Sequence, residues 1–216
     1  MHPNPAFRGQ PETEALAMAR ARGFGILTAQ GPAGPLASHV PFLLDTAGGE
    51  AEAHLVRSTA LTRALAAAEG PLDALLVVSG ADAYVSPDWY GEADKVPTWN
   101  YLAVHLRGRL RLAPERDMRA HLDRLSAHFE GRLLPKPPWK TDKMQPGTLN
   151  KMMRSIMPVV LEITGIESTV KLNQNRSAEA RQGAANAIAA GGTPGMETAT
   201  IAAMMHALDD DGPGNA

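Results

Sequence analysis

The segment HLVRSTALTRAL, residues 54–65, combines residue types that can hold a phosphate group. After His54, Arg57 supplies a guanidinium and Ser58 and Thr59 supply hydroxyls, where a strand-like alternation changes to a helical pattern. Backbone N–H groups and the helix dipole favour an anion at such a junction. The alternative is that a hydroxyl only caps the helix and the guanidinium is a solvated strand end.

A second segment, VPTWNY at residues 96–101, has the residue types that bind a flat ring. Trp99 offers an aromatic face, Asn100 offers a donor and an acceptor, and Tyr101 offers a phenol. Stacking would hold a heterocycle while the polar groups contact its edge. Together the two segments predict a planar, phosphorylated cofactor. The alternative is that these aromatic residues only pack in the core or at its rim.

Other cofactor and metal sites find no support in the sequence. It contains neither a strand–GxGxxG–helix unit nor a GxxxxGK[ST] segment. It has no cysteine, which excludes disulfides, thiolate zinc sites, iron–sulfur clusters and a cysteine nucleophile. The seven histidines have no HExxH spacing, so we assign no metal site.

Composition indicates a globular protein. The 216 residues are 44% hydrophobic and 20% charged, and the net charge of −2 provides no general attraction to nucleic acid or to an acidic bilayer. The N-terminal sequence MHPNPAFRGQPETE lacks a signal-peptide pattern, and no apolar run is long enough to span a membrane. We therefore expect a cytoplasmic protein without a membrane partner.

Segments of alternating hydrophobicity predict strands over most of the chain. The predicted strands cover 24–29, 34–45, 50–57, 72–80 and 102–112, with a strand pair at 158–172. Pro41 predicts an edge, a bulge or a break in its strand. Predicted helices cover 11–22, 59–69 and 114–130, and one more is expected after residue 191. Many short strands with peripheral helices favour a mainly β fold, an antiparallel β-barrel with helices attached.

A row of basic residues, Arg107, Arg109 and Arg111, shares one face of the strand predicted at 102–112. Such a row can contact nucleic acid phosphates. A solvated face balanced by acidic residues of the neighbouring helix is the more ordinary interpretation. Because the sequence has no helix-turn-helix pattern, direct operator binding has only weak support.

Six blocks in chain order carry a family resemblance: AFRG, SHVPFLLD, HLVRS, AYVSPDWYG, VPTWNYLAVHLRG and KLNQNRS. Between Pro5 and Ser177 the chain resembles the PaiB-like, FMN-binding negative transcriptional regulators. The resemblance implies the FMN-binding split β-barrel, an antiparallel and Greek-key-like fold, with FMN bound at the interface of a homodimer. We assign the barrel domain to residues 1–176. The Ala-rich, weakly apolar tail and its DDDGPGNA end predict a C-terminal helical extension at 177–208 and a disordered tail at 209–216.

The resemblance also implies which residues bind FMN. Residues of the first long strand line the flavin, the HLVRS block contacts the phosphate, and the VPTWNY block lies near the isoalloxazine. The KLNQNR block approaches the cofactor from the partner subunit. The implied residues are Ser38, His39, Val40, His54, Arg57, Ser58, Thr59, Thr98, Trp99, Asn100, Lys171, Gln174, Asn175 and Arg176.

Three functional classes follow from this resemblance and this fold. The first is an FMN-binding dimeric protein of the regulator family. The second is a flavin-dependent oxidoreductase, similar to pyridoxamine-phosphate oxidases or flavin reductases, in which the cofactor supplies the redox chemistry. The third is a haem-binding or haem-degrading split-barrel protein. Because a fold alone does not define a reaction, we assign no catalytic residue.

Overall fold

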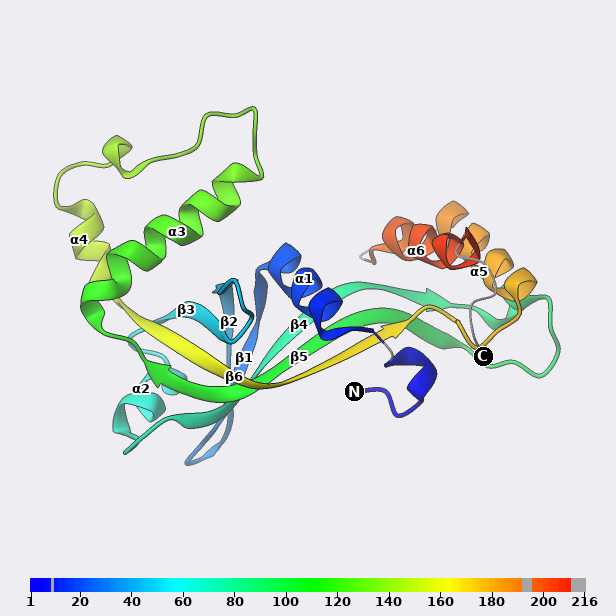
Figure 1. Ribbon diagram of the computed structural model, residues 1–216, viewed down its shortest axis with the longest axis horizontal. Coiled ribbons are helices and arrows are strands. Elements are labelled where there is room, and N and C mark those ends of the chain that lie inside the picture. Colours follow the sequence, from blue (N-terminus) through cyan, green and yellow to red (C-terminus); the bar gives the residue numbers. More distant parts are fainter. Residues whose placement is uncertain (9, 192–195, 211–216) are drawn as a thin grey trace. The chain divides into compact units, whose positions relative to one another are not determined.

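The computed structural model of the protein describes residues 1–8, 10–191 and 196–210 (Figure 1). The strands of this part of the chain are β1 (Phe24–Gly31), β2 (Gly34–Leu44), β3 (Glu50–Val56), β4 (Leu72–Val85), β5 (Thr98–Leu112) and β6 (Ile156–Lys171). The α-helices are α1 (Glu12–Arg22), α2 (Ala60–Ala67), α3 (Met118–Gly131), α4 (Thr148–Met153), α5 (Ala178–Ala190) and α6 (Thr198–Asp210). Short 3-10 helices are η1 (Pro5–Phe7), η2 (Pro87–Tyr90), η3 (Glu115–Asp117) and η4 (Thr141–Lys143).

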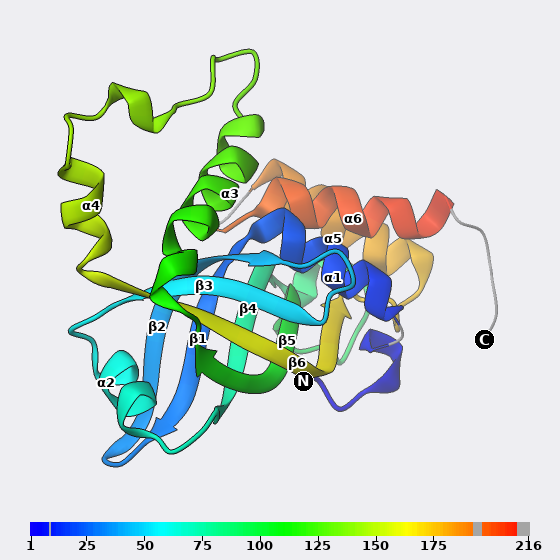
Figure 2. The same ribbon diagram turned by 60° about the vertical axis from the view of Figure 1, so that its left-hand side comes forward.

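The strands form a closed barrel in the order β1-β2-β3-β6-β5-β4 (Figure 2). Two groups of three consecutive strands, β1-β2-β3 and β4-β5-β6, are joined through antiparallel pairing of β1 with β4 and of β3 with β6. These pairings connect the outer strands of both groups and close the barrel. The predicted antiparallel barrel with peripheral helices is confirmed.

Alternate residues of the strands fill the barrel interior. Phe42 of β2 pairs with Ala53 of β3, and both side chains are buried. This spacing follows from the two-residue period of a strand, which sends every second side chain inward. The interior is lined by Leu27, Val40, Phe42, Ala51, Ala53, Leu76, Leu110, Val159 and Leu161. The alternation predicted at 102–112 is confirmed, because Leu106 and Leu110 are fully buried.

Two compact units divide the chain. The barrel unit consists of Ala19–Val78 and His105–Ile166, and the terminal unit consists of Met1–Met18, Ser79–Val104 and Glu167–Ala216. The strands β4, β5 and β6 each run through both units. The domain division expected after residue 176 stays a prediction. From residue 211 onward, the tail expected at 209–216 lies outside the described residues.

The terminal unit has its own apolar core. In Figures 1 and 2, α5 and α6 lie side by side, and both pack against the strands of this unit. The serine at the start of α5, Ser177, caps the helix by accepting a hydrogen bond from the backbone N–H of Ala180. The buried core consists of Ala81, Ala83, Val85, Tyr90, Leu102, Val170, Leu172, Ala180, Ala184, Ala185, Ile188, Ile201, Ala202 and Met205.

Local signals explain several element boundaries. Gly23 ends α1 with a φ of 59°, a left-handed conformation that glycine adopts readily, and its N–H bonds the carbonyl of Ala19. Pro41 lies inside β2, one residue before the pairing with β3 begins, so its missing N–H interrupts no bond to that strand. The strand pair predicted at 158–172 is wrong: β6 is one continuous strand, because its backbone makes no turn at Gly165.

Candidate functional site

The junction of β3 and α2 has the features of an anion site. Thr59 is the N-cap of α2, and its hydroxyl accepts a hydrogen bond from the N–H of Thr62. Ser58 is exposed beside it, and the guanidinium of Arg63 donates to the Ser58 carbonyl. The capping role considered for a hydroxyl is thus filled by Thr59, while the Ser58 side chain remains accessible. Arg63, which sequence reasoning missed, lies one helical turn after the cap.

Arg57 is held at this junction by several acceptors. Its guanidinium contacts the Glu115 carboxylate at 3.2 Å and donates to the carbonyls of Arg154 and Ile156 at 3.1 and 3.4 Å. The side chain is still 44% exposed. These contacts fix the guanidinium in one place, although the Glu115 carboxylate offsets part of its charge.

The predicted residues of β2 point in different directions. Val40 is 2% exposed and faces the barrel interior, so only its backbone can contact a ligand outside the barrel. His39 is exposed, and its ring stacks on Phe24 with ring centroids 6.3 Å apart. Ser38, directly before His39, is half-buried. Phe24 is 46% exposed and was not predicted as a site residue, although the aromatic residue that begins β1 was visible in the sequence.

His54 forms a pair with a histidine that sequence reasoning did not connect to it. The Nδ1 atom of His54 lies 3.1 Å from Nε2 of His121 on α3. Burial lowers the pKa of His54, and the charge of a protonated His121 lowers it further. Burial also lowers the pKa of His121. Both rings are therefore neutral at pH 7.

A second group of predicted residues lies in the terminal unit. Lys171 at the end of β6 donates to the Thr98 hydroxyl and, at 2.6 Å, to the Trp99 carbonyl. The Trp99 indole is 44% exposed and donates to the Asp82 carboxylate at 3.1 Å. Burial lowers the pKa of Lys171, and the nearby charge of Arg176 lowers it further. An anion beside these two cations would relieve their repulsion.

Some residues of the KLNQNR block are used by the protein itself. The Gln174 side chain bonds the backbone of Val170 and Leu172, which holds the turn after β6. The guanidinium of Arg176 lies over the Tyr90 ring, 5.1 Å from its centroid. Asn175 is exposed. Among these residues, the exposed amide and the guanidinium are the groups best placed to reach a ligand.

Asn100 does not accompany Trp99 at the surface. Successive residues of β5 face opposite sides, so Asn100 is fully buried, and its amide nitrogen contacts the sulfur of Met205 on α6 at 3.2 Å. Its Oδ1 atom has no hydrogen-bond partner among the described residues. The structure thus separates the aromatic face from the amide that the sequence analysis grouped with it.

The predicted site residues fall into two groups, and each unit contains one group. The barrel unit holds Ser38, His39, Val40, His54, Arg57, Ser58 and Thr59, and the terminal unit holds Thr98, Trp99, Asn100, Lys171, Gln174, Asn175 and Arg176. The first group offers hydroxyls, a helix N-terminus and guanidinium groups. The second group offers an exposed indole and two neighbouring cations, Lys171 and Arg176, and the charge of Arg176 also acts on the Glu92 carboxylate. These donors suit a phosphate and an aromatic ring system.

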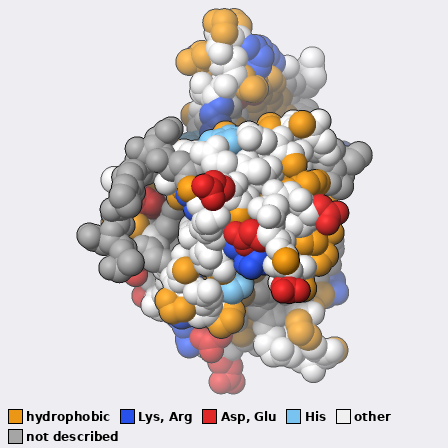
Figure 3. All heavy atoms as spheres, turned by 90° about the vertical axis from the view of Figure 1, so that its right-hand side faces the viewer, with side chains coloured by type: hydrophobic (Ala, Val, Ile, Leu, Met, Phe, Trp, Pro, Cys, Tyr) orange, Lys and Arg blue, Asp and Glu red, His pale blue; other side chains and the backbone are white. Residues whose placement is uncertain are grey.

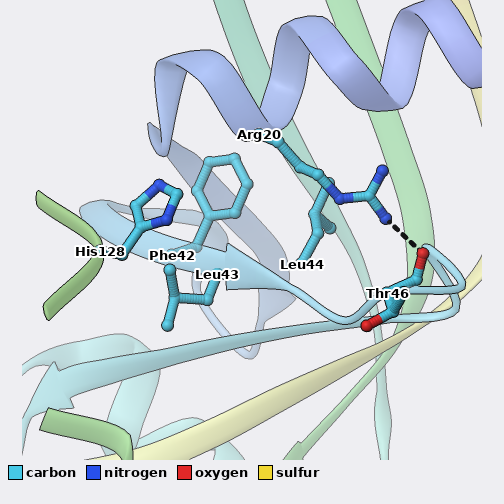
Figure 4. Close-up of a pocket in the computed structure, with 6 residues that line it drawn as sticks. All are labelled: Arg20, Phe42, Leu43, Leu44, Thr46 and His128. Carbon is cyan, nitrogen blue, oxygen red and sulfur yellow. Dashed lines mark hydrogen bonds between the residues drawn. The ribbon is translucent and has the colours of Figure 1, made fainter. Parts of the chain in front are cut away.

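A cavity of about 430 Å³ between α1, β2 and α3 is a poor candidate for the same role (Figure 4). Arg20 extends toward the turn after β2 and donates to the carbonyls of Asp45 and Thr46 at 2.6 and 3.0 Å. Phe42 and His128 lie at the other end of the cavity. Because the Arg20 guanidinium already donates to two backbone carbonyls, it stabilises the turn after β2 and is not available to a ligand.

The arginine row of β5 is balanced by acidic residues of strands. Arg109 pairs with Asp73 of β4 at 3.1 Å, and Arg111 pairs with Glu50 of β3 at 3.2 Å. The expectation that the neighbouring helix supplies these acids is wrong for both residues. On the face drawn in Figure 3, Lys and Arg side chains of the described residues are scattered among acidic and hydrophobic ones. Neither observation favours a nucleic-acid interface.

The closed six-stranded antiparallel barrel with its peripheral helices defines the class of protein: a split-barrel protein. The family described as "Putative FMN-binding domain" matches residues 1–165. The chain belongs to this family, and FMN is its cofactor, as the sequence analysis predicted.

One relative in sequence and two solved structures are similar to this chain. The "Protease synthase and sporulation protein PAI 2" of Bacillus subtilis is 28% identical over 157 residues, 72% of each chain. The "FAD and Heme binding protein" from Mycobacterium smegmatis has a TM-score of 0.56 at 18% identity, covering 86% of this chain and 80% of that one. The flavocytochrome Anf3 from Azotobacter vinelandii has a TM-score of 0.60 at 17% identity, covering 79% and 72%. At these identities the two structures support the fold alone.

Among the described residues, no helix combines the length and the apolar character that crossing a bilayer requires.

Proposed function

We propose that the protein is a homodimeric flavoprotein that holds the FMN phosphate at the junction of β3 and α2. The observation that carries this proposal is the fixed guanidinium of Arg57 beside the exposed hydroxyl of Ser58 and the N-terminus of α2. A positioned guanidinium, a hydroxyl and helix N–H groups form charge-assisted hydrogen bonds to a phosphate. The family match to FMN-binding domains supports the same ligand.

Exposed apolar side chains near this junction support the dimer. Val56, directly before Arg57, is 51% exposed, and Phe24 at the start of β1 is 46% exposed. Large apolar side chains at a ligand site are typical of surfaces that a partner covers. As the family resemblance implies, the KLNQNR block would reach the flavin from the partner subunit. A cytoplasmic location is part of this proposal, and the absence of cysteine agrees with it.

The purified protein is expected to absorb in the flavin region, to release FMN on heating and to have twice the chain mass of 22.9 kDa. Absorbance spectra, chromatography of the released ligand and light scattering with FMN present measure these three properties. A colourless protein that takes up no FMN in a titration would contradict flavin binding. A monomer in the presence of FMN would contradict the dimer, and a haem Soret band would favour the haem-binding alternative.

A redox role is the second candidate, and Lys171 and Arg176 favour it. A reduced flavin carries negative charge on its ring system, and nearby cations stabilise that form. Burial lowers the pKa of Lys171 and the charge of Arg176 lowers it further, so the two cations lie close to each other. The regulator role stays a hypothesis that rests on the family resemblance.

The substitution Lys171→Met is expected to weaken FMN binding by about tenfold, the scale of one hydrogen bond to a charged group. Isothermal titration of the apo protein with FMN measures the effect. Lys95→Met is the matched control, because Lys95 lies in the same unit but already pairs with Glu92 at 3.2 Å. Equal losses in both variants would mean that Lys171 contributes only general positive charge.

A further inference from the structure

A large cavity in the barrel unit lies between α3, the segment 132–147 and α4, and we call it the α3 cavity. Its volume is about 1000 Å³. Figure 2 shows α3, α4 and the segment that connects them around this region. The lining is mainly apolar and includes Leu122, Phe129, Trp139, Met144, Met152 and Met153. The volume and lining are typical of small-molecule sites, and methionine side chains adapt to flat apolar ligands.

His54 contributes a polar group to the wall of this cavity. Its Nδ1 atom is engaged with His121, at 3.1 Å from Nε2 of that ring. Its Nε2 atom has no hydrogen-bond partner among the described residues and is not one of the fully buried atoms. One imidazole nitrogen is therefore free to contact a molecule in the α3 cavity.

The charge of Glu52 determines which His54 nitrogen carries the proton. The Glu52 carboxylate pairs with Arg124 at 2.5 Å and lies 3.5 Å from Nδ1 of His121. Nδ1 of His121 is buried and has no hydrogen-bond partner among the described residues, but a lone pair facing the carboxylate at 3.5 Å would be repelled, so we assign the hydrogen to this atom. Its Nε2 is then an acceptor, which requires His54 to donate from Nδ1. Neutral His54 consequently presents a bare Nε2 lone pair to the α3 cavity.

Charged residues around the α3 cavity balance one another. Two cations and two anions line it, and Arg119 pairs with Asp123 at 2.8 Å while Glu130 pairs with Lys136 at 2.5 Å. The remaining charged lining residue is Lys140. This balance favours a neutral ligand over an ionic one. No set of three described His, Asp or Glu side chains is arranged to hold a metal ion, so Glu52, His121 and His54 do not form a metal centre.

We propose that the α3 cavity binds a planar, neutral aromatic alcohol whose hydroxyl donates a hydrogen bond to Nε2 of His54. The apolar lining accounts for the aromatic ring, and the bare nitrogen accounts for the hydroxyl. Glu52 and His121 are positioning residues, because they act through the tautomer of His54. The site uses residues of the barrel unit alone and goes beyond the binding of FMN.

The test compares two ligands of nearly equal shape, 1-naphthol and 1-methoxynaphthalene, in titrations of the FMN-saturated full-length protein. 1-Naphthol is expected to bind about three- to tenfold more tightly, because the ether cannot donate the hydrogen bond. His54→Phe should remove this preference, whereas Ser126→Ala, which removes another hydroxyl from the lining, should retain it. The ligand pair tests the unmodified protein, so the experiment remains decisive even if a variant fails to fold.

The same preference should depend on pH. Protonation turns Nε2 of His54 into a donor, so the advantage of 1-naphthol should decline as the pH falls through the lowered pKa of His54. The protonated ring can donate to the oxygen of either ligand, so the difference in affinity between 1-naphthol and the ether should disappear at low pH. The titratable and charged groups that face the His54–His121 pair or line the α3 cavity are Glu52, Arg119, Asp123, Arg124, Glu130 and Lys140.

Several outcomes would overturn the proposal. Equal affinity for the two ligands would mean that Nε2 accepts no hydrogen bond, and an unchanged preference in His54→Phe would place the ligand elsewhere. Competition between FMN and 1-naphthol would make the α3 cavity part of the flavin site. Dissociation of a dimer by 1-naphthol would mean that a second copy of the chain occupies it. Because 1-naphthol can also be titrated without FMN, failure of flavin binding would leave this test intact.

Discussion

Replacing Arg57 by alanine is expected to weaken FMN binding by about 1.5–3 kcal/mol, roughly 10- to 100-fold. The guanidinium is already fixed by Glu115 and by the carbonyls of Arg154 and Ile156, so little side-chain entropy is lost when it binds a phosphate. Isothermal titration with FMN measures the change. Thermal stability should fall only slightly, because the ion pair with Glu115 is exposed.

Two further variants make this result specific to the junction of β3 and α2. Arg109→Ala removes an arginine of similar exposure, 49% against 44%, that pairs with Asp73. Its FMN affinity should equal that of the unmodified protein. Glu115→Ala should strengthen FMN binding, because it removes the carboxylate that competes for Arg57. If the Arg57 and Arg109 variants bind FMN with equal affinity, Arg57 makes only structural contacts.

Gly108→Ala is expected to lower the free energy of unfolding by about 3 kcal/mol, at the upper end for an overpacked core. A Cβ at this position of β5 would lie 2.0 Å from the carbonyl oxygen of Glu162 on β6, so the two strands would have to separate. Urea unfolding followed by circular dichroism measures the loss.

The matched control is Gly165→Ala, where the nearest heavy atom to a new Cβ is 3.9 Å away. This variant should be as stable as the unmodified protein or slightly more stable, because alanine restricts the unfolded chain. If both variants lose stability equally, the close approach of β5 and β6 is not the cause.

The strands of the barrel could be predicted because their signal is local. Alternation of apolar and polar residues at 102–112 reports directly which side chains face the interior. The helix start at Thr59 was likewise visible, since hydroxyls before a helical pattern indicate a cap. Alternation did not show where one strand ends, so the segment 158–172 was interpreted as a strand pair, although β6 is one continuous strand.

The candidate site was only partly predictable, because its remaining features depend on contacts between distant residues. Glu115 is 58 residues from Arg57, and His121 is 67 residues from His54. The periodic patterns that predict strands and helices are local, so they do not indicate contacts between residues this far apart in the sequence. Asn100 looked available because it adjoins Trp99, yet α6 covers its side of the strand. Residues that are adjacent in a strand have side chains on opposite faces. The sequence pattern does not show which of the two faces α6 buries.

Because β4, β5 and β6 run through both units, neither unit is encoded by one continuous stretch of the gene. Each unit is assembled from separate stretches of chain, so no single break in the gene yields either one intact. A stop codon after residue 176 would spare every strand but remove α5 and α6, leaving the apolar side chains beneath them open to water. Recombination could therefore exchange the helical pair only for another segment that covers the same side chains.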